Sequence, residues 1–230
     1  MGTANGEARP VRLDLHLHSC FSHDAMNSPQ SIVRWAQRKG LDGVALTDHN
    51  TADGWNALRS VAREVGLLFI PGQEVRVTWR GEPIGDVVCL FLRAPIAGTE
   101  LDAVVEQVRE QNALVSVAHP FASRRWAFKN LKLLEYFPEL LIEVRNGRTY
   151  SRAGNERAEM LARTLNRGVT AGSDAHVPWE IGSVWVDVKA TDLDGAQQLL
   201  QAGKAVVRGH PASPVHILYS GVLGRLGVKL

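Results

Sequence analysis

The chain has 230 residues, of which 45% are hydrophobic and 22% are charged, and its formal net charge is +2. This is an ordinary globular composition, and without a run of like charges it argues against binding of long nucleic acid. No apolar run approaches the roughly 18 residues that span a membrane. The two cysteines form no CxxC pair, which favours a reducing cytoplasm.

The predicted elements alternate short strands with amphipathic helices. Residues 1–10 lack the apolar segment of a signal peptide and are expected to be a disordered lead-in. The first half is predicted to contain a strand at 11–16, a helix from Pro29 to Gly40, a strand at 43–47, a helix at 55–65, a strand at 67–70, and a hairpin of strands 75–79 and 86–92.

The second half resumes the alternation. Its predicted elements are a helix at 101–111, a strand at 114–117, a helix at 131–137, a strand at 140–144, a helix at 155–166, strands at 169–171 and 184–188, a helix at 192–202 and a strand at 205–208. The strand at 184–188 is expected to be an edge able to pair between subunits, although nothing indicates an oligomeric state. Residues 11–210 are taken as one domain, with 211–230 as a tail that packs on it or extends it.

Repeated strand–helix units predict a mostly parallel sheet with right-handed crossovers. Six acidic or imidazole side chains lie at or shortly after the ends of predicted strands: His16, His49, Glu74, His119, Glu143 and Asp174. In a barrel the carboxyl ends of all strands converge on one face, whereas the outer strands of an open sheet lie too far apart. The chain is therefore predicted to be an α/β protein, a distorted TIM-like (β/α) barrel of about seven strands.

The same positions suggest metal binding. His16 and His18 are two residues apart at a strand end, so both side chains point to one side, and Asp174 and His176 repeat this spacing. Each short motif is weak evidence alone, since a single histidine is usually a hydrogen-bonded structural residue. Mixed imidazole and carboxylate ligands suit Zn²⁺, Mn²⁺ or Fe²⁺.

Five short motifs occur in a fixed order. They are Asp14-x-His16-x-His18-Ser19, Thr47-Asp48-His49-Asn50, Glu74 after the third strand, Ala118-His119-Pro120 and Ser173-Asp174-Ala175-His176. Over about residues 11–210 this set resembles the PHP (polymerase and histidinol phosphatase) superfamily. The resemblance implies a distorted seven-stranded barrel, two or three divalent ions, and hydrolysis of phosphate esters by a metal-activated hydroxide.

The resemblance also implies a ligand set. One ion would be held by His16, His18, Glu74 and Asp174, and Glu74 would bridge to a second ion held by His119. A third ion would take His49, His176 and a residue of the loop after the first motif. Asp24 is the favoured loop residue, with its neighbour His23 as the alternative.

The sequence departs from the family where many members place a histidine ligand of the second ion. Here the segment reads Gly85-Asp86-Val87-Val88-Cys89. Asp86 is the nearest replacement ligand, unless it is a surface acid at a hairpin end. Cys89 is a soft alternative, although a buried thiol is the simpler interpretation. The second ion is therefore expected to be weak or absent.

Other residues are candidates for catalysis and substrate binding. Asp48, Glu74 and His176 are the candidate catalytic residues, and Glu143 could orient an imidazole or pair with Arg145. Arg148, Arg124 and Arg145 are the candidate phosphate ligands, because the guanidinium fork fits phosphate. The aromatic residues Trp126, Phe128 and Trp179 could stack a nucleobase or pack at the barrel rim.

The favoured function is therefore a phosphoesterase acting on a small phosphorylated metabolite or nucleotide. The alternatives are a histidinol-phosphate phosphatase, an exonuclease acting on short oligonucleotides, and a non-catalytic metal-binding barrel module. The sequence selects neither the substrate nor the metal.

Overall fold

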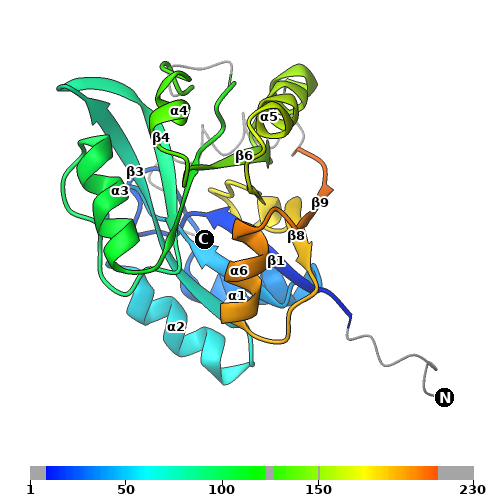
Figure 1. Cartoon of the computed structure of the whole chain (residues 1–230). Helices are drawn as coiled ribbons and strands as arrows, with labels where there is room; N and C mark the ends of the chain where they lie inside the picture. The colour runs from blue at the N-terminus through cyan, green and yellow to red at the C-terminus, as the bar shows by residue number, and fades with distance from the viewer. Residues whose placement is uncertain (1–8, 123–126, 150, 212–230) are drawn as a thin grey trace.

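A computed structural model of the chain describes residues 9–122, 127–149 and 151–211 (Figure 1). The strands are β1 (Val11–Leu17), β2 (Gly43–Leu46), β3 (Leu68–Trp79), β4 (Glu82–Leu90), β5 (Leu114–Val117), β6 (Leu141–Asn146), β7 (Val169–Gly172), β8 (Val184–Val188) and β9 (Val206–Gly209). The helices are α1 (Pro29–Arg38), α2 (Trp55–Glu64), α3 (Leu101–Glu110), α4 (Leu133–Tyr136), α5 (Arg152–Thr164) and α6 (Leu193–Gln201), with a 3₁₀ turn, η1, at Pro178–Glu180.

The strands form one sheet in the order β7-β6-β5-β4-β3-β2-β1-β8-β9. The sheet curls so that the end of β1 meets the segment that follows β7. There the amide of Asp174 donates to the carbonyl of His16 at 2.7 Å, and the amide of His18 donates to the carbonyl of Ala175 at 3.0 Å. The predicted α/β barrel is thereby confirmed as a nearly closed sheet of seven strands, from which β8 and β9 extend.

Alternate residues of each strand belong to two apolar clusters. Val87 and Cys89 of β4 pack in the outer cluster, together with residues of α1, α2, α3 and α5. Val88 and Leu90 pack in the inner cluster, to which α6 contributes Leu200. Because successive strand residues point to opposite faces, the inner cluster fills the barrel and the outer cluster joins it to the helices.

α6 closes the end of the barrel at which the parallel strands begin. A Cβ on Gly168, just before β7, would lie 2.8 Å from the Leu200 carbonyl, and Gln197 donates to the carbonyl of Asn112, just before β5. The opposite end, where β1, β2, β6 and β7 finish, is left for polar residues.

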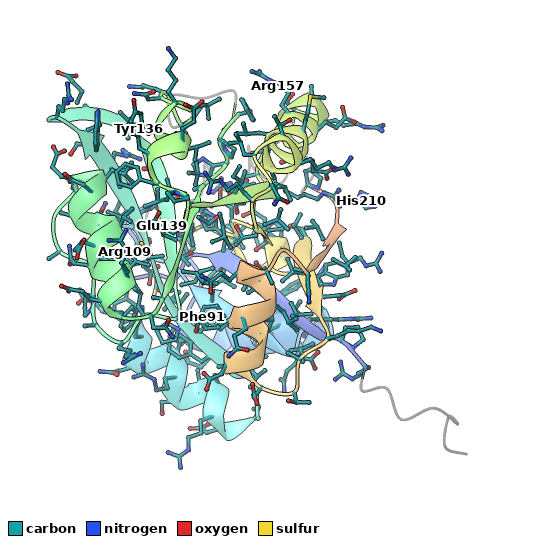
Figure 2. The ribbon with its side chains drawn as sticks, viewed as in Figure 1. Phe91, Arg109, Tyr136, Glu139, Arg157 and His210 are labelled. Atoms are coloured by element: carbon teal, nitrogen blue, oxygen red, sulfur yellow. The ribbon has the colours of Figure 1, made fainter. Side chains whose placement is uncertain are left out.

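The start of α1 and the turn between β3 and β4 agree with the sequence prediction. Ser28 caps α1 by accepting a hydrogen bond from the amide of Ser31, and Pro29 is its first residue. Arg80 and Gly81 link β3 to β4 with φ angles of 54° and 81°, as a two-residue hairpin turn requires. On the outer surface, Arg109 of α3 forms an ion pair with Glu139 (Figure 2). Among the described residues, no helix is long and apolar enough to cross a membrane.

Two sequence predictions were wrong. The strands expected at 67–70 and 75–79 are one continuous strand, β3, which pairs with β2 as far as Pro71 and with β4 from Gly72 onward. Pro71 is tolerated because its missing amide falls at this change of partner. The segment Val184–Val188 is not an edge, since β8 pairs with β1 on one side and β9 on the other.

Gly172 tests the seam between β1 and β7. A Cβ there would lie 2.4 Å from both the amide nitrogen and the Cβ of His16, so the two chains must separate to accept it. We expect Gly172→Ala to lower the free energy of unfolding by about 3 kcal/mol, measured by urea denaturation. The control is Gly203→Ala, where φ is 67° but the nearest atom is 3.8 Å away, and it should cost only about 1 kcal/mol. Equal losses would contradict a seam that depends on close contact.

Candidate metal centre

On the faces of the strands that point into the barrel, the residues change from apolar to polar toward the open end. Along β3, Ile70 lies in the inner apolar cluster and Glu74 lies four residues later on the same face. β4 runs the other way, so Leu90 and Val88 are followed toward the open end by Asp86. The same pattern places Glu143 above Leu141 on β6. The barrel therefore carries buried carboxylates at its open end.

Glu74 lies at the centre of these residues, and only 1% of it is exposed. Its Oε2 lies 2.9 Å from His49 Nδ1, 3.3 Å from His18 Nε2 and 3.5 Å from His16 Nε2. Its Oε1 lies 3.1 Å from His119 Nε2. Yet Oε2 has no well-aligned hydrogen-bond donor. A buried carboxylate oxygen surrounded by imidazole nitrogens, but hydrogen-bonded to none, suits a shared cation.

Four ligand atoms surround one point beside Glu74. His18 Nε2 lies 3.2 Å from both His16 Nε2 and Asp174 Oδ1, and His16 Nε2 lies 3.7 Å from that Asp174 oxygen. Ligands at about 2.1 Å from a tetrahedral ion are about 3.4 Å apart. The measured separations, with those to Glu74, scatter around that value, so His16, His18, Glu74 and Asp174 fit one divalent ion.

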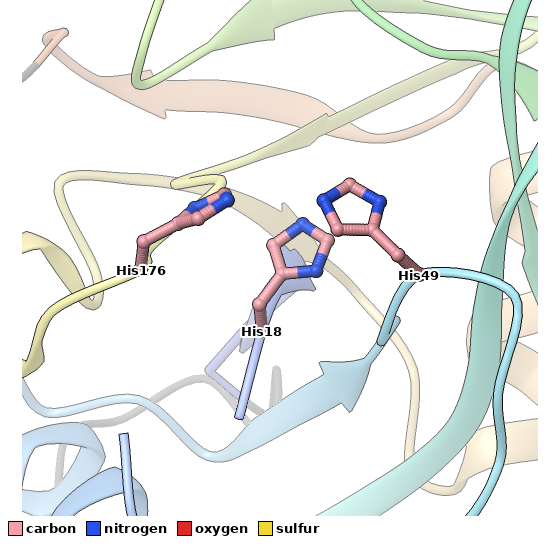
Figure 3. A group of neighbouring side chains, drawn as sticks. All are labelled: His18, His49 and His176. Carbon is pink, nitrogen blue, oxygen red and sulfur yellow. The ribbon is translucent and has the colours of Figure 1, made fainter. Parts of the chain in front are cut away.

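A second group lies toward the solvent. His18, His49 and His176 bring ligand atoms within 4.8 Å of one another, and Figure 3 shows their rings converging. Asp24 Oδ2 completes the group, at 3.5 Å from His49 Nε2 and 3.3 Å from His176 Nε2. His23 does not: its side chain is 82% exposed, its Nε2 lies 4.0 Å from Asp24, and its ring centroid lies 5.7 Å from that of His49. Of the two loop residues, Asp24 is therefore the one whose carboxylate lies beside His49 and His176, and its role as a ligand stays a prediction.

A third group consists of Glu74, Asp86 and His119, whose ligand atoms also lie within 4.8 Å. Asp86 is 2% exposed and so is not the surface acid that the sequence left open. Both of its oxygens receive hydrogen bonds from Arg76, at 2.9 and 3.3 Å. Cys89 is buried in the outer cluster, on the other face of β4, so the structure excludes it as a ligand.

The imidazoles are held by a further layer of hydrogen bonds. His16 Nδ1 donates to Glu143 Oε1 at 2.9 Å, which leaves Nε2 toward Glu74. His176 Nδ1 donates to the Asp174 carbonyl at 2.8 Å, which leaves its Nε2 toward Asp24. Asn146 donates to both Glu143 and Asp174, at 3.1 and 3.2 Å. These bonds fix the tautomers that metal ligands require.

Asp48 is not directed at the cluster. Its carboxylate accepts hydrogen bonds from the Ser19 amide at 2.7 Å, the Ser19 hydroxyl at 2.6 Å and the Ser22 hydroxyl at 2.9 Å. The Ser22 hydroxyl in turn accepts from the His49 amide at 3.0 Å and lies 3.4 Å from His18 Nδ1. Asp48 therefore ties together the loops that carry His18 and His49.

The charges of the cluster support one another. Burial lowers the pKa of His16, but Glu143, Asp174 and Glu74 outweigh it and hold the pKa well above its ordinary value. Burial also lowers the pKa of His49, but Glu74 and Asp24 outweigh this effect and raise the pKa to about 11. Burial, together with the neighbouring His49 and His176, lowers the pKa of His18 to about 3. Divalent ions would replace the protons held by the first two imidazoles.

Two of the candidate ligands have unusual backbone angles. His119 has a φ of 28° and Asp174 a φ of 53°, in the region that residues other than glycine rarely adopt. Such conformations concentrate at functional sites, where the surrounding structure enforces them. At Asp174 the enforcing contact is the seam with β1.

The other predicted site residues are less central. Arg145 points away from the cluster, because it pairs with Glu159 of α5 at 2.7 Å, and this contradicts its predicted contact with phosphate. Arg148 is half-buried in the turn after β6, and its amide donates to Asn146 Oδ1 at 2.9 Å. Phe128 is buried in the outer cluster and so is not placed to stack a base. Arg124 and Trp126 lie outside the described residues.

Sequence reasoning missed Arg76, Asn146, Ser19 and Ser22. The last two are adjacent to the His16–His18 motif, so their position was a usable signal. No signal in the sequence indicated the contacts of Arg76 and Asn146. The contacts of Arg76 depend on the register of β3 and β4, and those of Asn146 depend on the turn that follows β6.

A PHP domain model matches residues 14–154, and a PHP-associated model matches residues 152–205. An uncharacterized protein of Methanocaldococcus jannaschii is 30% identical over 195 residues, which cover 82% of this chain and 75% of that protein. A 5'-3' exoribonuclease of Haemophilus influenzae is 34% identical over 103 residues, 45% of this chain but only 37% of that enzyme.

Among solved structures, a two-domain protein of Bacteroides vulgatus, described as containing a predicted PHP-like metal-dependent phosphoesterase, superposes with a TM-score of 0.72. The match has 20% sequence identity and covers 97% of this chain and 74% of that one. The fold and site thus define a PHP-like barrel that gathers imidazoles and carboxylates at its open end. The chain belongs to the PHP domain family.

The loop ligand can be tested by metal content. We expect Asp24→Ala to lose about one equivalent of bound metal, because Asp24 lies between His49 and His176. His23→Ala is the matched control and should retain the wild-type amount, since its imidazole faces solvent. Inductively coupled plasma mass spectrometry on both variants measures the difference. A loss confined to His23→Ala would transfer the ligand role to His23.

Glu143 can be tested by metal affinity. We expect Glu143→Gln to weaken binding about 10–100-fold, because the amide no longer holds the His16 ring as the carboxylate does. Competition with a chromophoric chelator gives the dissociation constant. Glu159→Gln removes a carboxylate that pairs with Arg145 on the outer side of the sheet, and it should leave the affinity unchanged. An unchanged affinity in Glu143→Gln would remove the positioning role.

Proposed function

We propose that the chain is a metal-dependent phosphoesterase that hydrolyses a small phosphorylated metabolite or nucleotide. The observation that carries this proposal is Glu74, a buried carboxylate whose two oxygens face four imidazoles at the open end of a PHP barrel. Membership of the PHP domain family supports it. A structural metal site would need only one closed set of ligands.

The residues present fit two ion positions. His16, His18, Glu74 and Asp174 would hold one divalent ion, and Asp24, His49 and His176 would hold another. Ions bound there would lower the pKa of a water molecule toward neutrality and stabilise charge on phosphoryl oxygens. The metal could be Zn²⁺, Mn²⁺ or Fe²⁺, since all three accept imidazole and carboxylate ligands.

Exposure indicates the side from which a substrate would enter. The side chains of Glu74 and His18 are at most 1% exposed, whereas that of Asp24 is 41% exposed and that of His49 is 18% exposed. A phosphate group would therefore approach the Asp24 side and reach the deeper residues through it. Arg148 and Arg124 are the proposed phosphate ligands.

The candidate catalytic residues receive distinct roles. Glu74 and His176 act as ligands, and the hydrogen bond from His176 Nδ1 to the Asp174 carbonyl keeps Nε2 toward Asp24 and the ion that they would share. Asp48 is assigned a positioning role, because its oxygens are occupied by Ser19 and Ser22. Nothing in its surroundings directs a proton toward a leaving group.

A second candidate is exonucleolytic cleavage of short oligonucleotides. The relative named as a 5'-3' exoribonuclease favours this, since it shares 34% identity with 103 residues of this chain. The chemistry would be the same, with a phosphodiester in place of a monoester. The low net charge of +2 fits a short substrate better than a long duplex.

The test is hydrolysis by metal-loaded protein. We expect release of phosphate or nucleotide from a panel of aryl phosphate monoesters and diesters, sugar phosphates, nucleotides, histidinol phosphate and 5'-labelled short oligonucleotides. Chelator should abolish the activity, and Asp174→Ala should lower kcat/KM at least about 100-fold. The preferred class distinguishes the phosphatase, histidinol-phosphate and exonuclease alternatives.

Glu159→Gln is the matched control for Asp174→Ala, since this acid lies on the outer side of the sheet. If metal-loaded wild-type protein is inert toward the whole panel, the phosphoesterase proposal is wrong. Full metal occupancy without activity would then favour a non-catalytic metal-binding module.

A further inference from the structure

Arg76 stands beside the group formed by Glu74, Asp86 and His119. It lies two residues after Glu74 on β3, so both side chains are on the same face of the strand. Its amide donates to Asn50 Oδ1 at 3.1 Å, which fixes this part of β3 against the loop that carries His49. Its side chain is 34% exposed, whereas that of Asp86 is only 3% exposed.

The pairing of Arg76 with Asp86 is built into the hairpin. The two residues are directly opposite in the antiparallel ladder of β3 and β4. Arg76 Nε donates to Asp86 Oδ1 at 2.9 Å, and Nη2 donates to Oδ2 at 3.3 Å. This is the two-pronged contact for which guanidinium and carboxylate are matched in shape. The buried carboxylate is therefore neutralised by a residue of its own sheet.

A β-bulge creates this pairing. The ladder pairs Thr78 with Pro83 but Val77 with Gly85, so Ile84 is an extra residue on β4. With regular register, Arg76 would face Gly85 and Asp86 would point to the other face of the sheet. The bulge brings Asp86 both to Arg76 and to the inner face.

The partner of Asp86 differs in kind from those of the other acids. Glu74, Asp174 and Asp24 contact imidazoles, which can give up a proton and offer a lone pair to a metal ion. A guanidinium such as that of Arg76 carries a positive charge and offers no lone pair to a metal ion. A divalent ion held by Asp86 would lie next to a permanent positive charge in a buried site.

We propose that the Arg76 guanidinium takes the place of a metal ion at the Glu74–Asp86–His119 corner, so that the site holds two ions rather than three. The inference deepens the proposed function and rests on it only in that the other two groups bind metal. The guanidinium supplies fixed positive charge where a third ion would otherwise supply it.

The experiment counts bound metal in the full chain. Wild type and variants are loaded with excess Zn²⁺ or Mn²⁺, desalted and measured by plasma mass spectrometry. We expect about two equivalents in wild type and one more in Arg76→Gln, in which Asp86 is released to the ion. Arg76→Lys, which keeps the charge, should remain at the wild-type value. Circular dichroism checks that each variant is folded.

Asp86→Asn separates the two roles of Asp86. In the wild-type background it should leave the metal count unchanged, and in the Arg76→Gln background it should remove the additional ion. Three equivalents in wild type, or an equal count in wild type and folded Arg76→Gln, would overturn the inference while leaving the phosphoesterase proposal intact. Less than one equivalent in wild type would overturn the metal centre and this inference together. If Arg76→Gln does not fold, the wild-type count and Asp86→Asn still decide the question.

Discussion

The arrangement at the open end of the barrel depends on the cost of burying the Glu74 carboxylate. An ionised carboxylate removed from water is strongly disfavoured unless positive charge or hydrogen-bond donors surround it. Here four imidazoles surround it, three of them at one oxygen without a well-aligned hydrogen bond. Burial raises the pKa of Glu74, but His49 and His16 outweigh it and keep the group ionised. The cluster is thus a set of negative charges that protons or metal ions must balance.

The barrel provides the means of bringing these groups together. His16 and His18 end β1, and Asp174 and His176 follow β7, more than 150 residues later in the chain. Two backbone hydrogen bonds at the seam place them side by side. Gly172 has no side chain, which allows β7 to pass close to His16 of β1. The positive φ angle of Asp174 accompanies the turn of the chain into the site. A fold that left this seam open would separate the ligands of a single ion.

Much of this was predictable from local sequence. His16, His49, His119 and Asp174 each lie at or just after the end of a strand, and such ends converge in a barrel. Glu74 was also expected at a strand end, but it lies within β3 and reaches the site because it is on the inner face of that strand. Asp24 was favoured over His23 as the loop ligand, and that choice stays a prediction. The loop conformation supports it, because Asp24 lies beside His49 and His176 whereas the His23 side chain is exposed. Arg145 was expected to face the site, and in a regular strand it would share a face with Glu143, two residues earlier. The register of β6 shifts between Glu143 and Arg145, so the alternation of faces does not hold there. A sequence does not reveal such a shift.

The Arg76–Asp86 pair shows why register limits such reasoning. The sequence revealed an acid, Asp86, where the family resemblance implied a histidine, but the partner of Asp86 depended on one extra residue in β4. Once the register is known, the site divides into two electrostatic halves. On the Asp24 side the acids are balanced by imidazoles, which can exchange protons for metal, and the side chains reach solvent. On the Asp86 side the balancing charge is a guanidinium that cannot be exchanged. Under the proposed function, binding of metal and entry of a phosphate group would therefore both be directed to the Asp24 half of the site.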